Sequence, residues 1–370
     1  MIVGFDAKRI VRNATGLGSY GRTLVNDLIR RNDPGMQYLL YAPDKGRDVL
    51  SNQINIGDTA QFRYPDASAI IRQPSFLWRS YGIVNDLLRD GVQLYHGLSG
   101  ELPIGIRKKG IRTVVTIHDL IFLRHPEYYH WIDTKLYAWK FRKTLQEADR
   151  IIAISERTKQ DIMEFGNVSE ERIRLIYQSC APRFSSTFSE AEKQQVRSYY
   201  DLPERFVLNV GTIERRKNLL LAAKALEHLP SDIHLVAVGR QTKYAQELPQ
   251  NNRIHLLSGV PDTDLAIIYS LAEAFVYPSR YEGFGIPIIE AIAAGLPVVA
   301  CTGSCLEEAG GPDCLYVDPD DVEGMAAAIL SSLSDADGRT ARIQASQQYI
   351  RRFRGTDVAS QVLDVYRELL

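Results

Sequence analysis

The chain has 370 residues, of which 45% are hydrophobic and 24% are charged, and its 44 Lys and Arg nearly balance its 45 Asp and Glu. This ordinary globular composition excludes a disordered chain and a coiled coil, and a net charge of -1 argues against a nucleic-acid partner. Because a chain of this length exceeds what one hydrophobic core usually supports, we expect two domains.

The predicted strands, in chain order, are short β-branched runs separated by longer amphipathic segments, a pattern typical of a parallel sheet covered by helices. In the first half they are 2–5, 38–41, 92–95, 113–117, 151–154 and 173–176. In the second half they are 206–210, 233–238, 254–257, 274–277, 297–300 and 315–317. The two halves therefore predict an α/β protein with two Rossmann-like, doubly wound domains.

A Ser-rich segment without periodicity, 179–192, separates the halves and is predicted to be a linker. We expect domains at 1–185 and 186–350, followed by a C-terminal helix at 351–370 that packs back on the first domain. The four cysteines form no Cys-x-x-Cys pair, and the start of the chain lacks the apolar run of a signal peptide. These features indicate a cytoplasmic protein.

One apolar stretch, 283–303, approaches the length of a membrane span and carries only one charged residue, Glu290. Two prolines and four glycines interrupt it. A carboxylate at its middle would also cost at least about 2.5 kcal/mol in hydrocarbon. We therefore expect a buried strand and helix here.

The most specific motif runs from Glu282 to Glu290, where two acids bracket a Gly-rich turn. It follows a predicted strand, at the sheet edge where doubly wound folds bind ligands. Gly283 and Gly285 permit close approach of a ligand to the backbone, and the helix that follows directs N–H groups at an anion. The motif fits a ligand with hydroxyls on either side of a phosphate, such as a nucleotide sugar. Alternatively, Glu290 only favours the helix start and Glu282 is solvated.

A second motif, Gly211 to Asn218, places a glycine turn after the predicted strand 206–210 and then three adjacent cations. A departing nucleoside diphosphate gains negative charge as its glycosidic bond breaks, and a fixed cation stabilises that charge most in the transition state. Arg216 and Lys217 are the candidates. The alternative is an exposed basic helix start, which the helix dipole disfavours.

Gly16, Gly18 and Gly21 give the pattern G-x-G-x-x-G, which by itself suggests a dinucleotide site. That fingerprint follows its strand directly, whereas roughly ten residues separate the strand 2–5 from Gly16. The spacing argues against an NAD-dependent oxidoreductase. We expect a Gly-rich loop and a helix starting near Ser19, or else a plain helix start.

His118 follows the predicted strand 113–117 and therefore lies at a carboxyl edge of its sheet. A histidine in this place contacts a ligand or is a hydrogen-bonded core residue, and the sequence leaves both open. Neither the histidines nor the cysteines have zinc-site spacing. Asp318 and Asp320 are assigned to a helix cap. We expect no metal and no other cofactor.

These motifs resemble those of the family 4 glycosyltransferases, which have the GT-B fold, with two Rossmann-like domains facing across a cleft. The family signature is a pair of glutamates separated by seven residues, matched by Glu282 and Glu290. The resemblance implies that Glu282 bonds the hydroxyls of the donor sugar and that Glu290 holds the ribose. It also implies that backbone groups near Phe284 and Gly285 contact the sugar.

The same resemblance assigns the other motifs. Lys217 matches a family lysine, but Thr212 stands where the family more often has an arginine, for which Arg216 is the candidate substitute. The Gly-rich loop would lie over the donor phosphates, and His118 beside the 6-hydroxyl of the donor sugar. The expected catalytic residues are His118, Glu282 and Lys217. The expected donor-binding residues are Gly16, Gly18, Gly211, Arg216, Lys217, Phe284, Gly285 and Glu290.

The function that the resemblance implies is retaining, metal-independent transfer of a hexose from a nucleotide sugar to a glycan or lipid-linked glycan. A general likeness to bacterial polysaccharide mannosyltransferases favours GDP-mannose as the donor. A UDP-sugar-dependent transferase, an NAD-dependent oxidoreductase and a catalytically silent sugar-binding scaffold are the alternatives.

Basic and aromatic residues also gather in the first half, and this mixture suits weak contact with the inner face of an anionic membrane or with a lipid-diphosphate acceptor. They are Arg107, Lys108, Lys109, Arg112, Trp131, Trp139, Arg142 and Lys143. Because few charges are involved, the sequence favours a solvated basic face over membrane contact.

Overall fold

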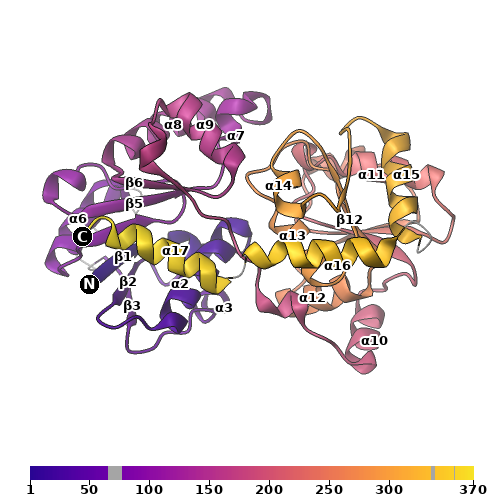
Figure 1. Ribbon diagram of the computed structural model, residues 1–370, viewed down its shortest axis with the longest axis horizontal. Helices are drawn as coiled ribbons and strands as arrows, with labels where there is room; N and C mark the ends of the chain where they lie inside the picture. The colour runs from indigo at the N-terminus through magenta and orange to yellow at the C-terminus, as the bar shows by residue number, and fades with distance from the viewer. Residues whose placement is uncertain (66–76, 335–337, 354) are drawn as a thin grey trace. The chain divides into compact units, whose positions relative to one another are not determined.

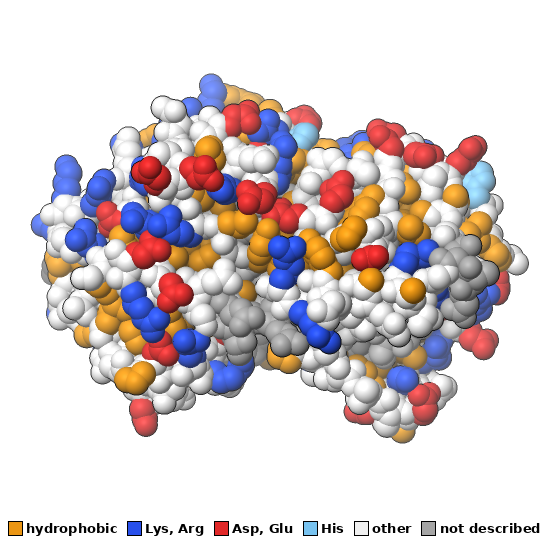
Figure 2. All heavy atoms as spheres, viewed as in Figure 1, with side chains coloured by type: hydrophobic (Ala, Val, Ile, Leu, Met, Phe, Trp, Pro, Cys, Tyr) orange, Lys and Arg blue, Asp and Glu red, His pale blue; other side chains and the backbone are white. Residues whose placement is uncertain are grey.

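The computed structural model describes residues 1–65, 77–334, 338–353 and 355–370. Two compact units are present (Figure 1): unit 1 comprises Met1–Ser179 with Phe353–Leu370, and unit 2 comprises Cys180–Arg352. The sequence led us to expect boundaries after residues 185 and 350. Figure 2 shows acidic and basic side chains interspersed over the face in view, in keeping with the near-zero net charge.

Unit 1 contains a seven-stranded parallel sheet in the order β3-β2-β1-β4-β5-β6-β7. Its strands are β1 (Ile2–Asp6), β2 (Gln37–Tyr41), β3 (Ala60–Arg63), β4 (Leu94–Gly97), β5 (Arg112–Ile117), β6 (Arg150–Ala153) and β7 (Ile173–Leu175). Each of the six predicted strands forms, within two residues at either end. The seventh, β3, was not predicted, because Gln61 and Arg63 interrupt the apolar character of its sequence Ala-Gln-Phe-Arg.

Helices cover both faces of this sheet, and alternate strand residues point into two separate cores. One core packs α1, α2 and α17 against the sheet, and the other packs α6, α8 and α9. The α-helices are α1 (Lys8–Arg12), α2 (Gly16–Arg31), α3 (Asp48–Ser51), α6 (Ile83–Arg89), α7 (Ile121–Arg124), α8 (Trp131–Glu147), α9 (Glu156–Gly166) and α17 (Gly355–Arg367). Shorter turns are η1 (Trp78–Gly82), η2 (Arg107–Lys109), η3 (Pro126–Tyr128) and η4 (Glu170–Arg172).

The last helix, α17, lies beside α2 in unit 1 (Figure 1). Its apolar residues Val358, Val362 and Val365 share one helical face and are buried. Tyr366 is fully buried and its hydroxyl lies 2.6 Å from Nδ1 of His96 on β4. The end of the chain is therefore part of the unit 1 core.

Unit 2 contains a six-stranded parallel sheet in the order β10-β9-β8-β11-β12-β13. Its strands are β8 (Phe206–Val210), β9 (His234–Val238), β10 (Ile254–Leu257), β11 (Ala274–Tyr277), β12 (Val298–Cys301) and β13 (Leu315–Val317). All six were predicted, four of them with the observed bounds. The strand order reverses between β8 and β11, and a doubly wound sheet binds its ligands outside such a point.

The α-helices of unit 2 are α10 (Glu190–Tyr199), α11 (Leu219–Ala225), α12 (Asp262–Leu271), α13 (Ile286–Ala293), α14 (Leu306–Gly310), α15 (Val322–Leu333) and α16 (Arg339–Tyr349). Shorter turns are η5 (Pro182–Ser185), η6 (Arg215–Lys217), η7 (Leu226–His228), η8 (Lys243–Glu247) and η10 (Ile350–Phe353), the last of which ends at the first residue back in unit 1. One core packs α11 and α15 against the sheet.

The predicted linker, 179–192, is only partly irregular. It contains η5, and α10 begins within it at Glu190. Ser189 and Glu192 form a capping box at this helix start, a short-range signal that the Ser-rich composition of the segment does not reveal.

The apolar stretch 283–303 forms α13 and β12 rather than one long helix. Across the described parts of the chain, no helix combines the length and the apolar character needed to cross a bilayer.

Candidate active site

A charged cluster lies at the carboxyl edge of the unit 2 sheet, where β8 and β11 end side by side. Gly211 follows β8 with φ +148°, and the chain then forms η6, which carries Arg216 and Lys217. The segment after β11 carries Glu282. Because neighbouring parallel strands end at the same edge, residues separated by more than 60 positions in sequence meet here.

The Glu282 carboxylate is held between two cations. Its Oε2 lies 2.9 Å from Nη1 of Arg216, and its Oε1 lies 2.6 Å from Nζ of Lys217. Nζ of Lys217 also donates to the Tyr277 hydroxyl at 2.7 Å, and Arg216 donates to the Tyr281 carbonyl at 2.6 Å. All three charged side chains are at most 16% exposed, so the cluster is neither the exposed basic turn nor the solvated acid of the alternative interpretations.

These contacts fix the protonation states of the cluster. Burial by itself would raise the pKa of Glu282, but the charges of Arg216 and Lys217 lower it to about 2. Burial lowers the pKa of Lys217, while the Glu282 carboxylate opposes that shift. The Glu282 carboxylate is therefore ionised at neutral pH and can act only as a hydrogen-bond acceptor.

The Gly-rich turn after Glu282 packs closely on α14. Gly285 has φ +131°, and a Cβ at this position would lie 3.1 Å from Cβ of Ala309. The buried Cys305 thiol lies 3.0 Å from the Glu282 carbonyl and 2.9 Å from the Phe284 carbonyl. Phe284 itself is 3% exposed. The Cys305 thiol thus binds the backbone of the turn at two carbonyls, and this residue was not among the predicted site residues.

Glu290 has a different environment, although it is only eight residues further along the chain. It lies in α13, the helix predicted to follow the Gly-rich turn, which begins at Ile286 and has a proline in its first turn. Its Oε2 accepts a hydrogen bond from the buried Tyr269 hydroxyl at 3.0 Å. Burial raises the pKa of Glu290 to about 7, and the Tyr269 hydrogen bond partly offsets this rise. Glu290 is therefore poised to titrate near neutral pH.

His118 lies directly after β5 and is buried in unit 1, as predicted for a strand end. Its Nε2 lies 2.8 Å from the Leu98 carbonyl, and its Nδ1 lies 2.8 Å from Nε2 of Gln178. Burial lowers its pKa to about 4, so the ring is neutral at physiological pH. Nε2–H donates and Nδ1 accepts, which leaves neither nitrogen available as a general base.

A buried polar chain runs beside His118 and was not predicted. The Thr116 hydroxyl contacts the Tyr20 hydroxyl at 3.0 Å and Nε2 of His96 at 2.8 Å, and His96 in turn contacts Tyr366. Burial lowers the pKa of His96 to about 3. The ring of Tyr20 packs edge-on against that of His118, with centroids 4.7 Å apart. The Tyr20 ring, together with the bonds to Leu98 and Gln178, fixes the orientation of the His118 ring.

The Gly-rich segment differs from the prediction. The helix α2 begins at Gly16 rather than near Ser19, so Gly16 and Gly18 lie in its first turn and not in a loop. A Cβ on Gly18 would lie 1.8 Å from the Asn13 carbonyl, whereas a Cβ on Gly16 would meet open space. Gly18 is therefore required by packing, and only Gly16 has room beside it for another group.

A second charged cluster, also missed, lies at the end of β1 in unit 1. Asp6 is 3% exposed, and Nε of Arg79 donates to its Oδ2 at 3.1 Å. Nη1 of Arg79 lies 2.5 Å from Oε2 of Glu101, whose Oε1 lies 3.2 Å from Nζ of Lys140. The sequence signal for this cluster was Asp6, an acid directly after the predicted strand 2–5. The four charges pair with one another at the carboxyl edge.

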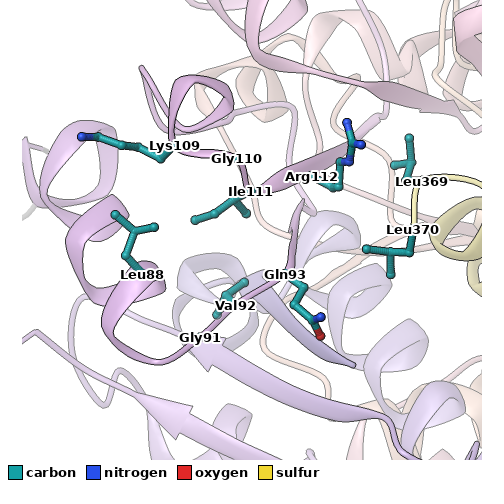
Figure 3. Close-up of a pocket in the computed structure, with 10 residues that line it drawn as sticks. All are labelled: Leu88, Gly91, Val92, Gln93, Lys109, Gly110, Ile111, Arg112, Leu369 and Leu370. Carbon is teal, nitrogen blue, oxygen red and sulfur yellow. The ribbon is translucent and has the colours of Figure 1, made fainter.

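A cavity of about 450 Å³ lies at the opposite edge of the unit 1 sheet (Figure 3). Residues that precede or begin β4 and β5, including Gln93 and Arg112, line it together with Leu369 and Leu370. It contains none of the candidate site residues. Among the described residues, no group of three or more His, Cys, Asp or Glu is arranged to hold a metal ion.

Comparison with known proteins assigns the family. Residues 14–179 match the family described as Glycosyltransferase Family 4, and residues 190–349 match Glycosyl transferases group 1. The chain is 28% identical over 388 residues to the O-antigen chain mannosyltransferase B of Escherichia coli, with all of both chains covered. It is 27% identical over 262 residues to the Escherichia coli serotype-specific mannosyltransferase WbdA, covering 66% of this chain but only 32% of WbdA.

Solved structures agree on the fold. The Anabaena protein HepE in complex with UDP-glucose superposes with a TM-score of 0.76 at 17% identity, covering 100% of this chain and 99% of HepE. This likeness and the two parallel sheets confirm the expected GT-B fold. Since the two family matches together account for most of residues 14–349, the chain belongs to the family 4 glycosyltransferases and is a hexosyltransferase.

Proposed function

We propose that this glycosyltransferase is a retaining, metal-independent mannosyltransferase that uses GDP-mannose and extends a glycan or lipid-linked glycan in surface polysaccharide synthesis. The observation that carries the proposal is the Glu282 carboxylate held between Arg216 and Lys217 at the sheet edge. Without donor, Glu282 and Glu214 together balance the charges of Arg216 and Lys217. A nucleotide sugar offers Glu282, Arg216 and Lys217 each a new partner.

In this mechanism, the donor diphosphate attracts Arg216 and Lys217, while the sugar hydroxyls donate to Glu282. The carboxylate is suited to this role because it is ionised and accepts only. The two cations stabilise the charge that grows on the leaving diphosphate. Thr212 stands where the family more often has an arginine, and Arg216, which contacts both Glu282 and the Tyr281 carbonyl, is positioned to replace that charge.

The transfer step we propose is front-face attack. The bond from the anomeric carbon to the diphosphate oxygen breaks as the bond to the acceptor oxygen forms on the same face. The acceptor proton passes to the leaving diphosphate, so no protein base is needed. The observation that both ring nitrogens of His118 are engaged supports this route. His118 then acts as a neutral, fixed group beside the donor sugar.

Mannose is favoured by the names of the relatives, since O-antigen chain mannosyltransferase B and WbdA are both mannosyltransferases. A UDP-sugar is the second candidate, since HepE was solved with UDP-glucose. Metal independence rests on the two cations, which supply the positive charge that a diphosphate needs. Unchanged transfer in excess chelator is the expected result, and restoration by added Mg²⁺ or Mn²⁺ would contradict it.

The alternative function, an NAD-dependent oxidoreductase, is not supported by the structure of the Gly-rich segment. Helix α1 intervenes between β1 and Gly16, so the glycines do not form the turn that a dinucleotide pyrophosphate requires. Asp44, which follows the second strand and is the acid that could hold a ribose in a dinucleotide site, is paired with Arg12.

The test is a thermal-shift and calorimetric panel of GDP-, UDP- and ADP-sugars on the wild type and on Glu290→Ala. A ligand that binds only the native state raises the unfolding temperature. We expect GDP-mannose to stabilise the wild type most and the substitution to remove that effect. Stronger binding of a UDP-sugar would replace the donor assignment, and no binding by any nucleotide sugar would overturn the proposal.

A further inference from the structure

Helix α8 of unit 1 exposes an unusual amount of apolar surface. Fourteen large hydrophobic side chains are exposed among the described residues, and five of them lie on this one helix. They are Trp131 (62% exposed), Ile132 (53%), Leu136 (46%), Tyr137 (40%) and Trp139 (45%). Single exposed apolar residues need no explanation, but a contiguous group marks an interaction surface.

Helix α8 carries apolar side chains on two opposite sides. Phe141, Thr144 and Leu145 face the unit 1 core and are buried. At 100° per residue, Ile132, Leu136 and Trp139 project from the opposite side. The face directed away from the core therefore carries aliphatic and indole groups where a solvated helix would carry polar ones. We call this surface, formed by Trp131, Ile132, Lys135, Leu136, Trp139 and Lys143, the α8 face.

The charges on and beside the α8 face are mainly positive. Between residues 131 and 143 the helix has one acid, Asp133, and four cations, Lys135, Lys140, Arg142 and Lys143. Of these, Lys140 is paired with Glu101, while Nζ of Lys135 lies 4.8 Å from the centre of the Trp131 ring. Cations thus alternate with the apolar groups.

A second basic segment is tied to the end of this helix. Glu147, the last residue of α8, accepts hydrogen bonds from the backbone N–H of Gly105 at 2.8 Å and of Arg107 at 3.2 Å. These bonds hold η2, with the exposed residues Arg107, Lys108 and Lys109, against the end of α8. The positive charge therefore continues beyond the helix itself.

We propose that the α8 face docks on an anionic lipid bilayer, with the helix lying in the plane of the interface. Indole rings and aliphatic side chains that alternate with Lys and Arg are the groups that enter the boundary between headgroups and acyl chains. The cations attract anionic headgroups at the same time. A second copy of the chain is a poorer occupant, because symmetric pairing would place these cations against one another.

The tryptophans allow a direct test. Trp78 is 4% exposed and its indole N–H donates to Asp86, so it reports from inside unit 1, whereas Trp131 and Trp139 lie on the α8 face. We would mix the full chain with vesicles of phosphatidylglycerol that carry brominated acyl chains, and with matched phosphatidylcholine vesicles. The expected result is co-sedimentation with the anionic vesicles and quenching of Trp131 and Trp139 but not of Trp78, resolved with Trp131→Phe and Trp139→Phe.

Leu136→Glu and Leu330→Glu form a matched pair, since both leucines lie on helices and are 46% and 41% exposed. Leu136→Glu should weaken vesicle binding at least tenfold, and Leu330→Glu should leave it unchanged. Equal thermal unfolding temperatures of the two variants would exclude misfolding as the cause. Because the assay contains no nucleotide sugar, its result is independent of the proposed donor.

Three results would overturn the proposal. The first is no co-sedimentation with anionic vesicles, and the second is binding that leaves Trp131 and Trp139 unquenched. The third is a wild-type dimer, seen by light scattering, that Leu136→Glu converts to a monomer, because a second copy would then occupy the α8 face.

Discussion

Glu282 and Glu290 are the same residue type in one short segment, yet their surroundings differ completely. Glu282 meets two cations, which hold its pKa at about 2, whereas Glu290 meets a tyrosine hydroxyl, and burial raises its pKa to about 7. The first is a permanent acceptor within a neutralised charge cluster. The second can gain or lose its proton in the physiological range, so the two carboxylates should respond differently to substitution and to pH.

Removing the Glu282 charge should have the largest effect. Glu282→Gln leaves Arg216 and Lys217 without their shared counter-charge and removes the proposed acceptor for the sugar hydroxyls. We expect kcat/KM to fall by about 10²–10³-fold, in the range seen when a transition-state contact is lost. Steady-state transfer kinetics with saturating acceptor provide the measurement.

Glu214→Gln is the matched control, because Glu214 also accepts from Arg216, at 2.8 Å, but not from Lys217. It should reduce kcat/KM by only a few-fold, roughly the value of a partly exposed ion pair. Equal losses in the two variants would show that general charge balance, rather than the position of Glu282, sets the activity.

The pH dependence of donor binding separates the two carboxylates further. If Glu290 holds the ribose, as the family resemblance implies, the ribose hydroxyls would donate best to its ionised form, and protonation near pH 7 would weaken that acceptor. Donor affinity, measured by calorimetry from pH 8 to pH 6, should therefore weaken as the pH falls, by at most about tenfold per pH unit. Glu282, with a pKa of about 2, contributes nothing in this window.

Glu290→Gln supplies the comparison for this titration. It should bind the donor weakly at every pH and remove the slope between pH 6 and pH 8. A slope that survives in Glu290→Gln would assign the titration to another group.

Tyr269→Phe should produce a smaller change in the same titration. The Tyr269 hydroxyl lowers the pKa of Glu290 by bonding its carboxylate, so its loss should move the midpoint to higher pH and weaken donor binding at pH 7 a few-fold. The expected size is that of an ordinary hydrogen bond, whose net contribution of roughly 0.5–1.5 kcal/mol corresponds to a factor of about 2 to 12. Tyr316→Phe, which removes a bond to the Gly311 carbonyl, should not move the midpoint.

Cys305 offers the smallest expected effect, because it acts on Glu282 only through the backbone. Cys305→Ala removes the thiol that contacts the Glu282 and Phe284 carbonyls, and we expect donor KM to rise a few-fold with kcat nearly unchanged. Cys305→Ser keeps a donor and should restore the wild-type KM. Cys314→Ala tests specificity, since that thiol bonds the Gly310 carbonyl instead. A loss equal to that of Cys305→Ala would contradict the positioning role.

Most of the fold could be predicted because its signals are local. Short apolar runs located twelve of the thirteen described strands, and the Gly-rich turn after Glu282 predicted the helix that follows it, α13. Two local signals were absent or misread. The strand β3 has no continuous apolar run, and the glycines taken for a loop lie in the first turns of α2, where Gly18 packs against the Asn13 carbonyl.

The candidate site was only partly readable. Glu282, Glu290, Arg216 and Lys217 stand in recognisable motifs, but nothing local connects Glu290 with Tyr269 or Glu282 with Cys305. Those partners lie 21 and 23 residues away and meet through the order of the strands.

The sequence by itself determined the two doubly wound sheets, the family and the residue types at the carboxyl edge of the unit 2 sheet. Hydrophobic periodicity and motif spacing are properties of neighbouring residues. Only the tertiary structure decided which carboxylate is ionised, that both nitrogens of His118 are engaged, and that the α8 face is left uncovered. Each of these depends on burial and on partners from distant segments, and the energy of a charge is set by what surrounds it after folding.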